Sequence, residues 1–282
     1  MVRAKRSLGQ NFLVDKNIQR KIVDALEAGP GDVVLEIGPG TGALTRHLAG
    51  TVRRLVAIEL DDRLVQSLRT EFADAPGVEI VHADALTVDL AELVEDVATL
   101  KVVGNIPYNI TSPLIFWLIE REIRPERIVL MIQKEVADRI LAPPGEKTYG
   151  ALSVGVRAVA DVERLFNVSR GAFRPVPDVE SAVIRITPRT PPPLAPAEEE
   201  DLRTLTRAAF AWRRKQLQKI LRSAPEYGLD PETLETVGRE AGIDLGARPE
   251  TLPPEAFIRL ARALRAAGYP ERTDTTRPME DA

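Results

Sequence analysis

Cysteine is absent from the 282-residue chain, and histidine occurs only twice. Without cysteine the chain has no disulfide, no thiolate metal site and no cysteine nucleophile, which excludes pyrimidine C5 methylation through an attacking thiol. Neither His47 nor His82 has a second histidine or a carboxylate at the spacing of metal ligands, so we expect no metal site. The lack of disulfides is compatible with a reducing cytoplasm.

Long apolar runs and an excess of positive charge are also missing. No run is long enough to span a membrane, and the first residues lack the apolar core of a signal peptide, so we expect a cytoplasmic protein with no membrane partner. The formal net charge is −4, with 44% hydrophobic and 28% charged residues, which is ordinary globular composition. The length fits one larger domain and one smaller domain.

Residues 100–108 carry the most informative pattern. An apolar run predicts a short buried strand, and it ends in Asn-Ile-Pro-Tyr at residues 105–108. The side-chain oxygen of Asn105 and the backbone carbonyl of Ile106 can both accept hydrogen bonds from one exocyclic amine, and Pro107 fixes the backbone between them and Tyr108. Tyr108 offers a face on which a base can stack. The pattern predicts a slot for a flat base that carries an amine, with a plain strand-end turn as the alternative.

A glycine loop follows an earlier predicted strand. Residues 33–37 are typical of a central parallel strand, and residues 38–42 read Gly-Pro-Gly-Thr-Gly before a helical pattern. Gly38 and Gly40 allow the backbone to approach a ligand, and the helix start offers free N–H groups. The loop is neither the Gly-x-Gly-x-x-Gly of dinucleotide enzymes nor a Walker A loop. With Glu36 before it, the loop resembles the first motif of S-adenosylmethionine-dependent methyltransferases, and a purely structural glycine turn is the alternative.

Two acidic residues stand at the ends of the next two predicted strands. Glu59 follows the glycine loop by about twenty residues, the position at which a carboxylate binds a ribose diol. Asp84 comes after the third strand and can accept a hydrogen bond from an adenine amine. Either acid alone could be an ordinary solvated carboxylate at a strand end. Two such acids at successive strand ends after a glycine loop favour a nucleoside-binding site.

Prolines stiffen the loop before the last predicted strand of this domain. Pro175 and Pro177 lie between predicted strands at residues 162–168 and 181–186. We expect this loop to hold Phe173 out as a wedge or second stacking face, with a buried hydrophobic anchor as the alternative.

A proline-dense and then acidic stretch divides the chain. We predict a domain at residues 1–187 with an N-terminal basic arm, a linker at 188–201, a helical RNA-binding domain at 202–268 and a disordered tail at 269–282. Basic residues interleaved with Phe210 and Trp212 in the helical domain predict a phosphate-binding surface, and a solvated helix face is the alternative. The residues expected to bind RNA are Arg207, Arg213, Arg214, Lys215, Lys219 and Arg222.

Taken together, these motifs resemble one family. The chain is similar to the ribosomal RNA adenine N6-dimethyltransferases, and most of all to those of the bacterial small subunit. The matching motifs are residues 9–13, 36–42, 59, 84–86, 105–108, 133–137, 149–150 and 173–183. The family more often has Leu at the position of Ile106, a difference that leaves the carbonyl role unchanged.

The resemblance implies a fold, a reaction and further site residues. The implied fold is α/β, a doubly wound Rossmann-like methyltransferase sheet of seven strands with a small C-terminal all-α domain. The implied reaction is transfer of methyl groups from S-adenosylmethionine to N6 of two adjacent adenosines near the 3′ end of 16S rRNA in the 30S subunit or its precursor, with a role in 30S biogenesis, by a monomer. The residues implied to contact the cofactor are Asn11, Leu13, Gly38, Glu59, Asp84 and Asn105.

Three other functions remain open from the sequence. A 23S rRNA adenine methyltransferase of the macrolide-resistance type would share the slot and act on another RNA. An assembly factor for the small subunit would use the basic cluster with catalysis secondary. A DNA adenine methyltransferase is less favoured, because its motif usually has Asp or Asn before Pro-Pro-Tyr.

Overall fold

The structure is a computed structural model that describes residue 5 and residues 10–94, 96–120 and 123–270. The rest of the predicted basic arm and residues 271–282 of the predicted tail lie outside the described residues. The chain forms two compact units, one of residues 1–141 and 159–193 and the other of residues 142–158 and 194–282.

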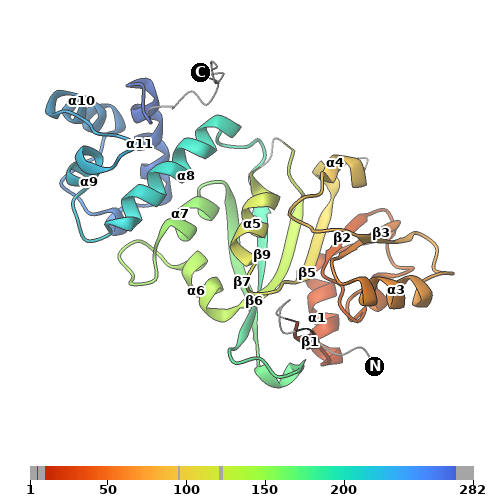
Figure 1. Ribbon diagram of the computed structural model, residues 1–282. Coiled ribbons are helices and arrows are strands. Elements are labelled where there is room, and N and C mark those ends of the chain that lie inside the picture. The colour runs from red at the N-terminus through yellow and green to blue at the C-terminus, as the bar shows by residue number, and fades with distance from the viewer. Residues whose placement is uncertain (1–4, 6–9, 95, 121–122, 271–282) are drawn as a thin grey trace, which may run out of the picture. The chain divides into compact units, whose positions relative to one another are not determined.

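A seven-stranded sheet forms the core of the first unit (Figure 1). Its strands run in the order β4-β3-β2-β5-β6-β9-β7, with the first five parallel and β9 antiparallel to both β6 and β7. The strands are β2 (Val33–Ile37), β3 (Arg54–Glu59), β4 (Val78–His82), β5 (Lys101–Asn105), β6 (Arg127–Gln133), β7 (Ala160–Val168) and β9 (Ser181–Pro188). The expected sheet of seven strands and the doubly wound α/β class are confirmed.

Apolar residues on both faces of the strands explain why the sheet is central. Val34, Leu55 and Val103 pack with helices α1 and α2 in one hydrophobic cluster, while Leu35 and Val56 on the opposite face are fully buried too. Strands buried on both faces read as continuous apolar runs, which is why the sequence pattern located them. The helices of this unit are α1 (Lys16–Leu26), α2 (Thr45–Leu48), α3 (Asp62–Glu71), α4 (Leu90–Leu93), α5 (Thr111–Ile119) and α6 (Lys134–Leu141).

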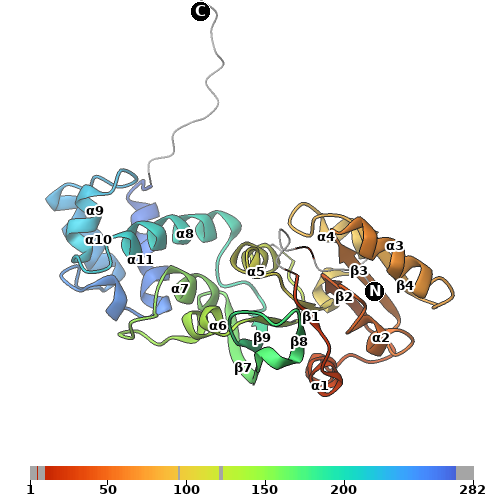
Figure 2. The same cartoon turned by 60° about the horizontal axis from the view of Figure 1, so that its bottom comes forward.

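A second, two-stranded sheet joins segments that are far apart in the sequence. Strand β1 (Phe12–Leu13) pairs antiparallel with β8 (Phe173–Arg174), and the two lie side by side in Figure 2. The pairing sets Leu13 opposite Phe173, and both side chains are buried in the cluster that covers the main sheet. The N-terminal segment is thereby fixed beside the carboxyl ends of the strands.

Two helices of this unit begin in different ways. Asp15 caps α1, with its carboxylate accepting from the backbone N–H groups of Asn17 and Ile18. Helix α5 begins at Thr111, directly after Ile110, whose N–H bonds to the Pro107 carbonyl. The turn after the Asn-Ile-Pro-Tyr segment therefore leads directly into α5.

The second unit is built of helices and corrects the predicted boundaries. Its helices are α7 (Ala151–Arg157), α8 (Pro196–Ala211), α9 (Leu217–Ser223), α10 (Pro231–Ala241) and α11 (Pro254–Ala266). The predicted linker at 188–201 is wrong from residue 196 onward, because Pro196 and the acidic residues after it form the first turns of α8, as proline and acids at a helix start favour. Residues 142–158 also belong to this unit rather than to the predicted domain 1–187. An aromatic core explains this, since Tyr149 packs edge-on against Phe210 at 5.8 Å and Phe210 stacks on Phe257 at 5.7 Å.

Candidate active site

A cavity of about 1090 Å³, counting its solvent-open mouth, lies in the first unit at the carboxyl ends of β2, β3, β4 and β5. Ligands of open α/β sheets bind at this edge, where the strand order reverses between β2 and β5. Predicted residues that line the cavity are Asn11, Leu13, Gly38, Gly40, Glu59, Asp84, Asn105, Ile106, Pro107 and Tyr108.

The glycine loop forms one wall of this cavity. Gly38 and Gly40 have φ values of 66° and 59°, in the left-handed region where residues with a side chain are strained. A Cβ on Gly40 would lie only 3.2 Å from the ring of Phe12 across the cavity wall. The loop therefore requires glycine for its backbone shape, and at Gly40 also for the close approach of the N-terminal segment.

Glu59 holds the loop and the next turn together at the tip of β3. Its Oε2 accepts from the Gly40 N–H at 3.1 Å, and its Oε1 accepts from the N–H groups of Leu60 and Asp61 at 2.9 Å each. Burial raises the pKa of this carboxyl above its usual value. Oε2 accepts only one of these bonds and retains an acceptor site, so the carboxylate is fixed in place with capacity left for a ligand hydroxyl.

Glu36 is a second buried acid on the cavity wall. Its side chain is 1% exposed and accepts a hydrogen bond of 2.7 Å from the Thr45 hydroxyl. Burial, together with the neighbouring charge of Glu59, raises the pKa of Glu36 to about 7. The cavity thus carries two carboxyl groups that favour a cationic ligand when ionised.

Asp84 differs from these acids because it is exposed. It lies two residues beyond β4, and its Oδ1 accepts from the Leu86 N–H at 3.0 Å in a tight turn. Asp84 lies at the rim of the cavity, where the sequence pattern predicts an acceptor for an adenine amine.

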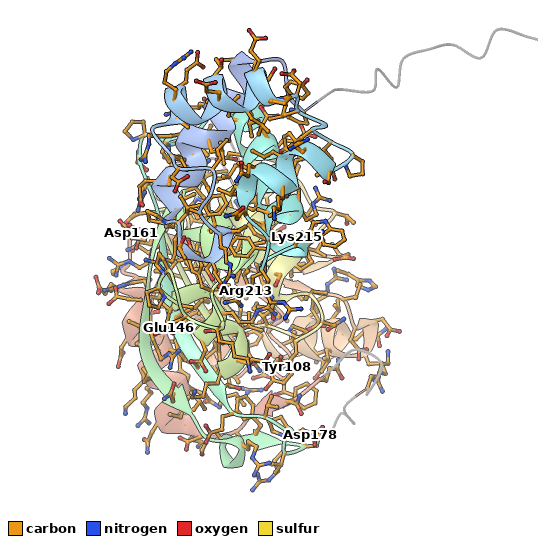
Figure 3. The ribbon with its side chains drawn as sticks, turned by 90° about the vertical axis from the view of Figure 1, so that its left-hand side faces the viewer. Tyr108, Glu146, Asp161, Asp178, Arg213 and Lys215 are labelled. Atoms are coloured by element: carbon orange, nitrogen blue, oxygen red, sulfur yellow. The ribbon has the colours of Figure 1, made fainter. Side chains whose placement is uncertain are left out.

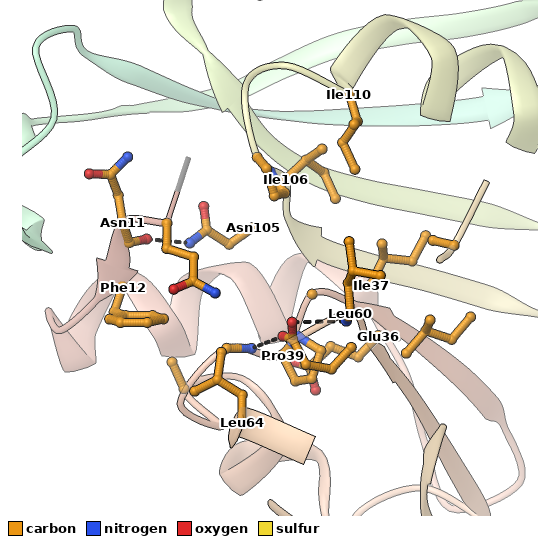
Figure 4. Close-up of a pocket in the computed structure, with 18 of the residues that line it drawn as sticks. Asn11, Phe12, Glu36, Ile37, Pro39, Leu60, Leu64, Asn105, Ile106 and Ile110 are labelled. Carbon is orange, nitrogen blue, oxygen red and sulfur yellow. Dashed lines mark hydrogen bonds between the residues drawn. The ribbon is translucent and has the colours of Figure 1, made fainter. Parts of the chain in front are cut away.

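The Asn105 amide is oriented by the N-terminal segment. Its Nδ2 donates to the Asn11 carbonyl at 3.0 Å, as the dashed line in Figure 4 shows. Because the Asn11 carbonyl can only accept, the atom of the Asn105 amide that faces it must be the nitrogen. Oδ1 of Asn105 is therefore the atom that can accept a further hydrogen bond. No described residue donates to Oδ1 or to the Ile106 carbonyl, while the Ile106 N–H is bonded to the Met131 carbonyl at 3.1 Å. Asn105 Oδ1 and the Ile106 carbonyl are therefore the acceptors of this segment that the described residues leave available at the end of β5.

Tyr108 lines the cavity beside these acceptors. Its hydroxyl shares a hydrogen bond of 3.1 Å with the Ser181 hydroxyl, and burial raises its pKa. The bond ties the ring to the start of β9, so the aromatic face is held at the slot.

Phe173 does not do what the sequence predicted. Its side chain is 1% exposed and packs in the hydrophobic cluster with Leu13 and Val183. The expectation that the proline loop holds it out as a wedge or stacking face is wrong, because strand pairing of β8 with β1 turns the ring into the core. The alternative interpretation, a buried hydrophobic anchor, is the one that the structure bears out.

Several cavity residues were missed by the sequence patterns. Gln10, Phe12, Asn109 and Ile110 also line the cavity. Gln10 and Phe12 fall inside the motif at residues 9–13, so their position beside Asn11 was the available signal. Asn109 and Ile110 directly follow the slot, and only the turn at Pro107 brings them to the cavity.

The basic cluster of the second unit divides into inward and outward side chains. Arg213 donates to the Glu250 carboxylate at 2.5 Å and to the Glu146 carbonyl at 2.9 Å, and it also bonds to the Lys147 carbonyl. Figure 3 labels Arg213 and Glu146 among the side chains of this unit. The Arg213 guanidinium is therefore engaged within the unit. The other predicted residues are exposed, namely Arg207, Arg214, Lys215, Lys219 and Arg222.

Two other kinds of site are missing from the described residues. In that part of the chain, no three histidine or acidic side chains come together as metal ligands. The helices that the structure describes include none with the length and apolar character needed to cross a bilayer.

Comparison with known proteins identifies relatives over nearly the whole chain. A family model described as "Ribosomal RNA adenine dimethylase" matches residues 1–265. The chain is 46% identical over 269 residues to "Ribosomal RNA small subunit methyltransferase A" of Geobacter metallireducens, covering 95% of this chain and 98% of that one.

Two solved structures are similar to the fold. One is a dimethyladenosine transferase from Plasmodium falciparum, with a TM-score of 0.77 and 26% identity, covering 92% of this chain and 98% of that one. The other is the 23S rRNA methyltransferase ErmE, with a TM-score of 0.67 and 32% identity, covering 90% of this chain and 100% of that one.

Proposed function

The chain belongs to the ribosomal RNA adenine dimethylase family, and from this we propose that it dimethylates N6 of two adjacent adenosines near the 3′ end of 16S rRNA. It is an enzyme that uses S-adenosylmethionine, as the family does. The observation that carries the proposal is the pair of neighbouring acceptors, Asn105 Oδ1 and the Ile106 carbonyl, next to the Tyr108 ring. We propose the 30S subunit or its precursor as the partner, in the cytoplasm, with the enzyme acting as a monomer in 30S biogenesis.

The residues of the cavity fit S-adenosylmethionine. Gly38 and Gly40, at positive φ, would let the backbone approach the ligand, Glu59 would accept from the ribose, and Asp84 would accept from the adenine amine. Asn11 and Leu13 would complete the wall that the N-terminal segment supplies. The ionised forms of Glu36 and Glu59 favour a cationic cofactor. When bound, S-adenosylmethionine supplies an electrophilic methyl group, because that group is attached to a positively charged sulfur.

The slot residues prepare the target nitrogen. The N6 amine of adenine is a weak nucleophile, because its lone pair is delocalised into the ring. Hydrogen bonds from its N–H groups to Asn105 Oδ1 and to the Ile106 carbonyl favour a tetrahedral nitrogen and fix its direction. With S-adenosylmethionine held at the glycine loop, Glu59 and Asp84, the nitrogen that Asn105 and Ile106 orient would receive the methyl group as the cofactor gives up its carbon–sulfur bond, and the displaced N6 proton would leave to water.

Entry of the base requires that it leave its stack in the RNA. Tyr108 offers a stacking face at the slot, worth about 1–3 kcal/mol per base. Phe173 is buried and is not part of this proposal. The exposed basic side chains of the second unit would bind phosphates and position the RNA without reading its sequence.

Substrate mapping tests the proposal. Purified protein and labelled S-adenosylmethionine are incubated with 30S particles that lack the modification and, separately, with naked 23S rRNA, and mass mapping locates the methyl groups. We expect dimethyladenosine on the small-subunit RNA alone. Methylation of 23S rRNA alone would favour a 23S rRNA methyltransferase, the class to which ErmE belongs. Tight particle binding without methyl transfer would favour an assembly factor.

A further inference from the structure

Asp61 is a buried carboxylate that joins two parts of the cavity wall. Its side chain is 0% exposed. Oδ2 accepts from the Gln10 Nε2 at 3.1 Å, and its backbone N–H donates to Glu59 Oε1 at 2.9 Å. Gln10 and Glu59 both line the cavity, whereas Asp61 lies behind them.

Two cations complete the surroundings of this carboxylate. Lys5 Nζ lies 3.0 Å from Oδ1, and Arg63 Nη2 lies 2.7 Å from Oδ2. The hydrogen bonds from the Arg63 guanidinium and from Lys5 hold the pKa of Asp61 well below its usual range. The group is therefore ionised at any pH at which the protein is used, and its acceptors are permanently available to the N-terminal segment.

Both polar atoms of the Gln10 amide are hydrogen-bonded, so a half-turn rotation of the amide would break both bonds. Its Nε2 donates to Asp61, and its Oε1 accepts from the Lys5 N–H at 2.7 Å. Asn11 and Phe12 are held by contacts that do not involve Asp61. The Asn11 carbonyl accepts a hydrogen bond from the Asn105 amide, and Phe12 pairs with Arg174 in the two-stranded sheet. The side chain of Gln10 is thus the part of the wall that depends on Asp61.

Building on the proposed function, we infer that Asp61 is a positioning residue for S-adenosylmethionine, because it fastens Gln10 to the part of the cavity wall that carries Glu59. Asp61 touches neither cofactor nor target base in this arrangement. It acts on cofactor affinity by keeping the Gln10 wall and the Glu59 carboxylate in register. The slot at Asn105 has its own support and does not depend on Asp61.

A conservative substitution separates this role from helix capping. Asp61 is the N-cap of α3, accepting from the Arg63 N–H. Asparagine caps helices about as well as aspartate, so Asp61→Asn keeps the cap. The new amide nitrogen replaces one acceptor by a donor. The oxygen that remains keeps the place of Oδ1, which accepts from Lys5 Nζ and from the Arg63 Nε and backbone N–H. The new nitrogen then takes the place of Oδ2 and faces Gln10 Nε2 and Arg63 Nη2. The Gln10 amide cannot reverse without losing its bond from the Lys5 N–H.

The matched control is Asp62→Asn. This neighbour also lies near Lys5 Nζ, at 3.5 Å, but its side chain is 61% exposed and it bonds to neither Gln10 nor Glu59. The rescue variant combines Asp61→Asn with Gln10→Glu. The carboxylate at position 10 then accepts from the new amide and from the Lys5 N–H, and it restores the lost negative charge beside Lys5 and Arg63.

Calorimetric titration of the full-length protein with S-adenosylhomocysteine tests the inference. For Asp61→Asn we expect about tenfold weaker binding, an equal rise in KM for S-adenosylmethionine, and a kcat within about threefold of wild type. For Asp62→Asn we expect binding within about twofold of wild type. We expect the double variant to recover most of the affinity, with similar thermal unfolding midpoints for all four proteins.

Other results would overturn the inference. Binding by Asp61→Asn equal to wild type would remove the positioning role. A double variant no better than Asp61→Asn would mean that the hydrogen bond to Gln10 is not the cause. A wild-type protein that binds S-adenosylhomocysteine but methylates no small-subunit RNA would overturn the proposed function, while the affinity series would still decide the role of Asp61.

Discussion

The side-chain amide of Asn105 donates to the backbone carbonyl of Asn11 across a gap of 3.0 Å. This one bond fixes the orientation of the amide, so that its oxygen is the atom left to accept a hydrogen bond. It also connects the N-terminal segment, which lines the cofactor cavity, to the end of β5, where the target base is proposed to enter. Cofactor wall and base slot are therefore parts of one hydrogen-bonded structure.

Tyr108 and Phe173 should respond differently to the same substitution. Tyr108→Leu removes the aromatic face at the slot, and we expect kcat/KM for the RNA to fall about 10- to 100-fold, as the loss of a base stack implies. Phe173→Leu shrinks a core side chain, and we expect a loss of about 1–2 kcal/mol in the free energy of unfolding with kcat/KM within about threefold. Steady-state kinetics and urea unfolding measure both. If the Phe173→Leu protein is stable but loses most of its activity, Phe173 contributes to base binding and the assignment as a core residue alone is wrong.

Glu36 should make the stability of the cofactor-free protein depend on pH. Its pKa is about 7 in the folded protein, against 4.5 for the ordinary carboxyl, so the folded state binds this proton more tightly than the unfolded state. The resulting stability is fully present below about pH 4.5 and is lost as pH rises to about 7. Relative to Glu36→Gln, we expect wild type to lose on the order of 3 kcal/mol of unfolding free energy across this range.

Urea unfolding of wild type and Glu36→Gln at several pH values between 5 and 8 measures this difference. Glutamine can still accept from the Thr45 hydroxyl, so the substitution removes the charge and keeps the bond. Glu92→Gln, at an exposed site, serves as a control and should track wild type. Parallel pH curves for wild type and Glu36→Gln would contradict the prediction.

Arg213 and Arg214 are adjacent arginines with different expected effects. Arg213→Ala removes the bonds to Glu250 and to two carbonyls of the loop at residues 146–147, and we expect about 1–3 kcal/mol lower unfolding free energy. Arg214→Ala removes an exposed charge, and we expect unchanged stability with weaker binding to small-subunit particles and a salt dependence reduced by about one phosphate contact. Unfolding curves and binding titrations at several salt concentrations distinguish the two. Equal effects of both substitutions on stability would contradict the assignment.

Residues at strand ends were the most predictable part of the site. Gly38, Glu59 and Asn105 each end or follow a short apolar run, and parallel strands bring their carboxyl ends to one edge whatever the details of packing. Local pattern and topology were therefore enough to gather them around one cavity. Asn11 and Leu13 could be placed only through family resemblance, because they reach the cavity by pairing with β8.

The failures of prediction share a physical cause, which is tertiary contact over long sequence separations. Proline spacing indicates a stiff loop but not which way Phe173 faces, and that direction is set by its pairing with Leu13. Likewise, a run of basic residues does not reveal that Arg213 turns inward to Glu250, nor that Tyr149 brings residues 142–158 into the helical unit. Such contacts cannot be read from the composition of either segment alone.

The most direct test of the slot is the turnover of Asn105→Ala on small-subunit particles that lack the modification. The substitution removes one of the two acceptors for the adenine amine and the bond to Asn11, while Glu59 and the glycine loop remain. With saturating S-adenosylmethionine, we predict a fall in kcat of at least about 100-fold, with binding of S-adenosylhomocysteine weakened less than about tenfold. If kcat stays within threefold of wild type while S-adenosylhomocysteine still binds, Asn105 does not position the target amine and the account of the slot is wrong.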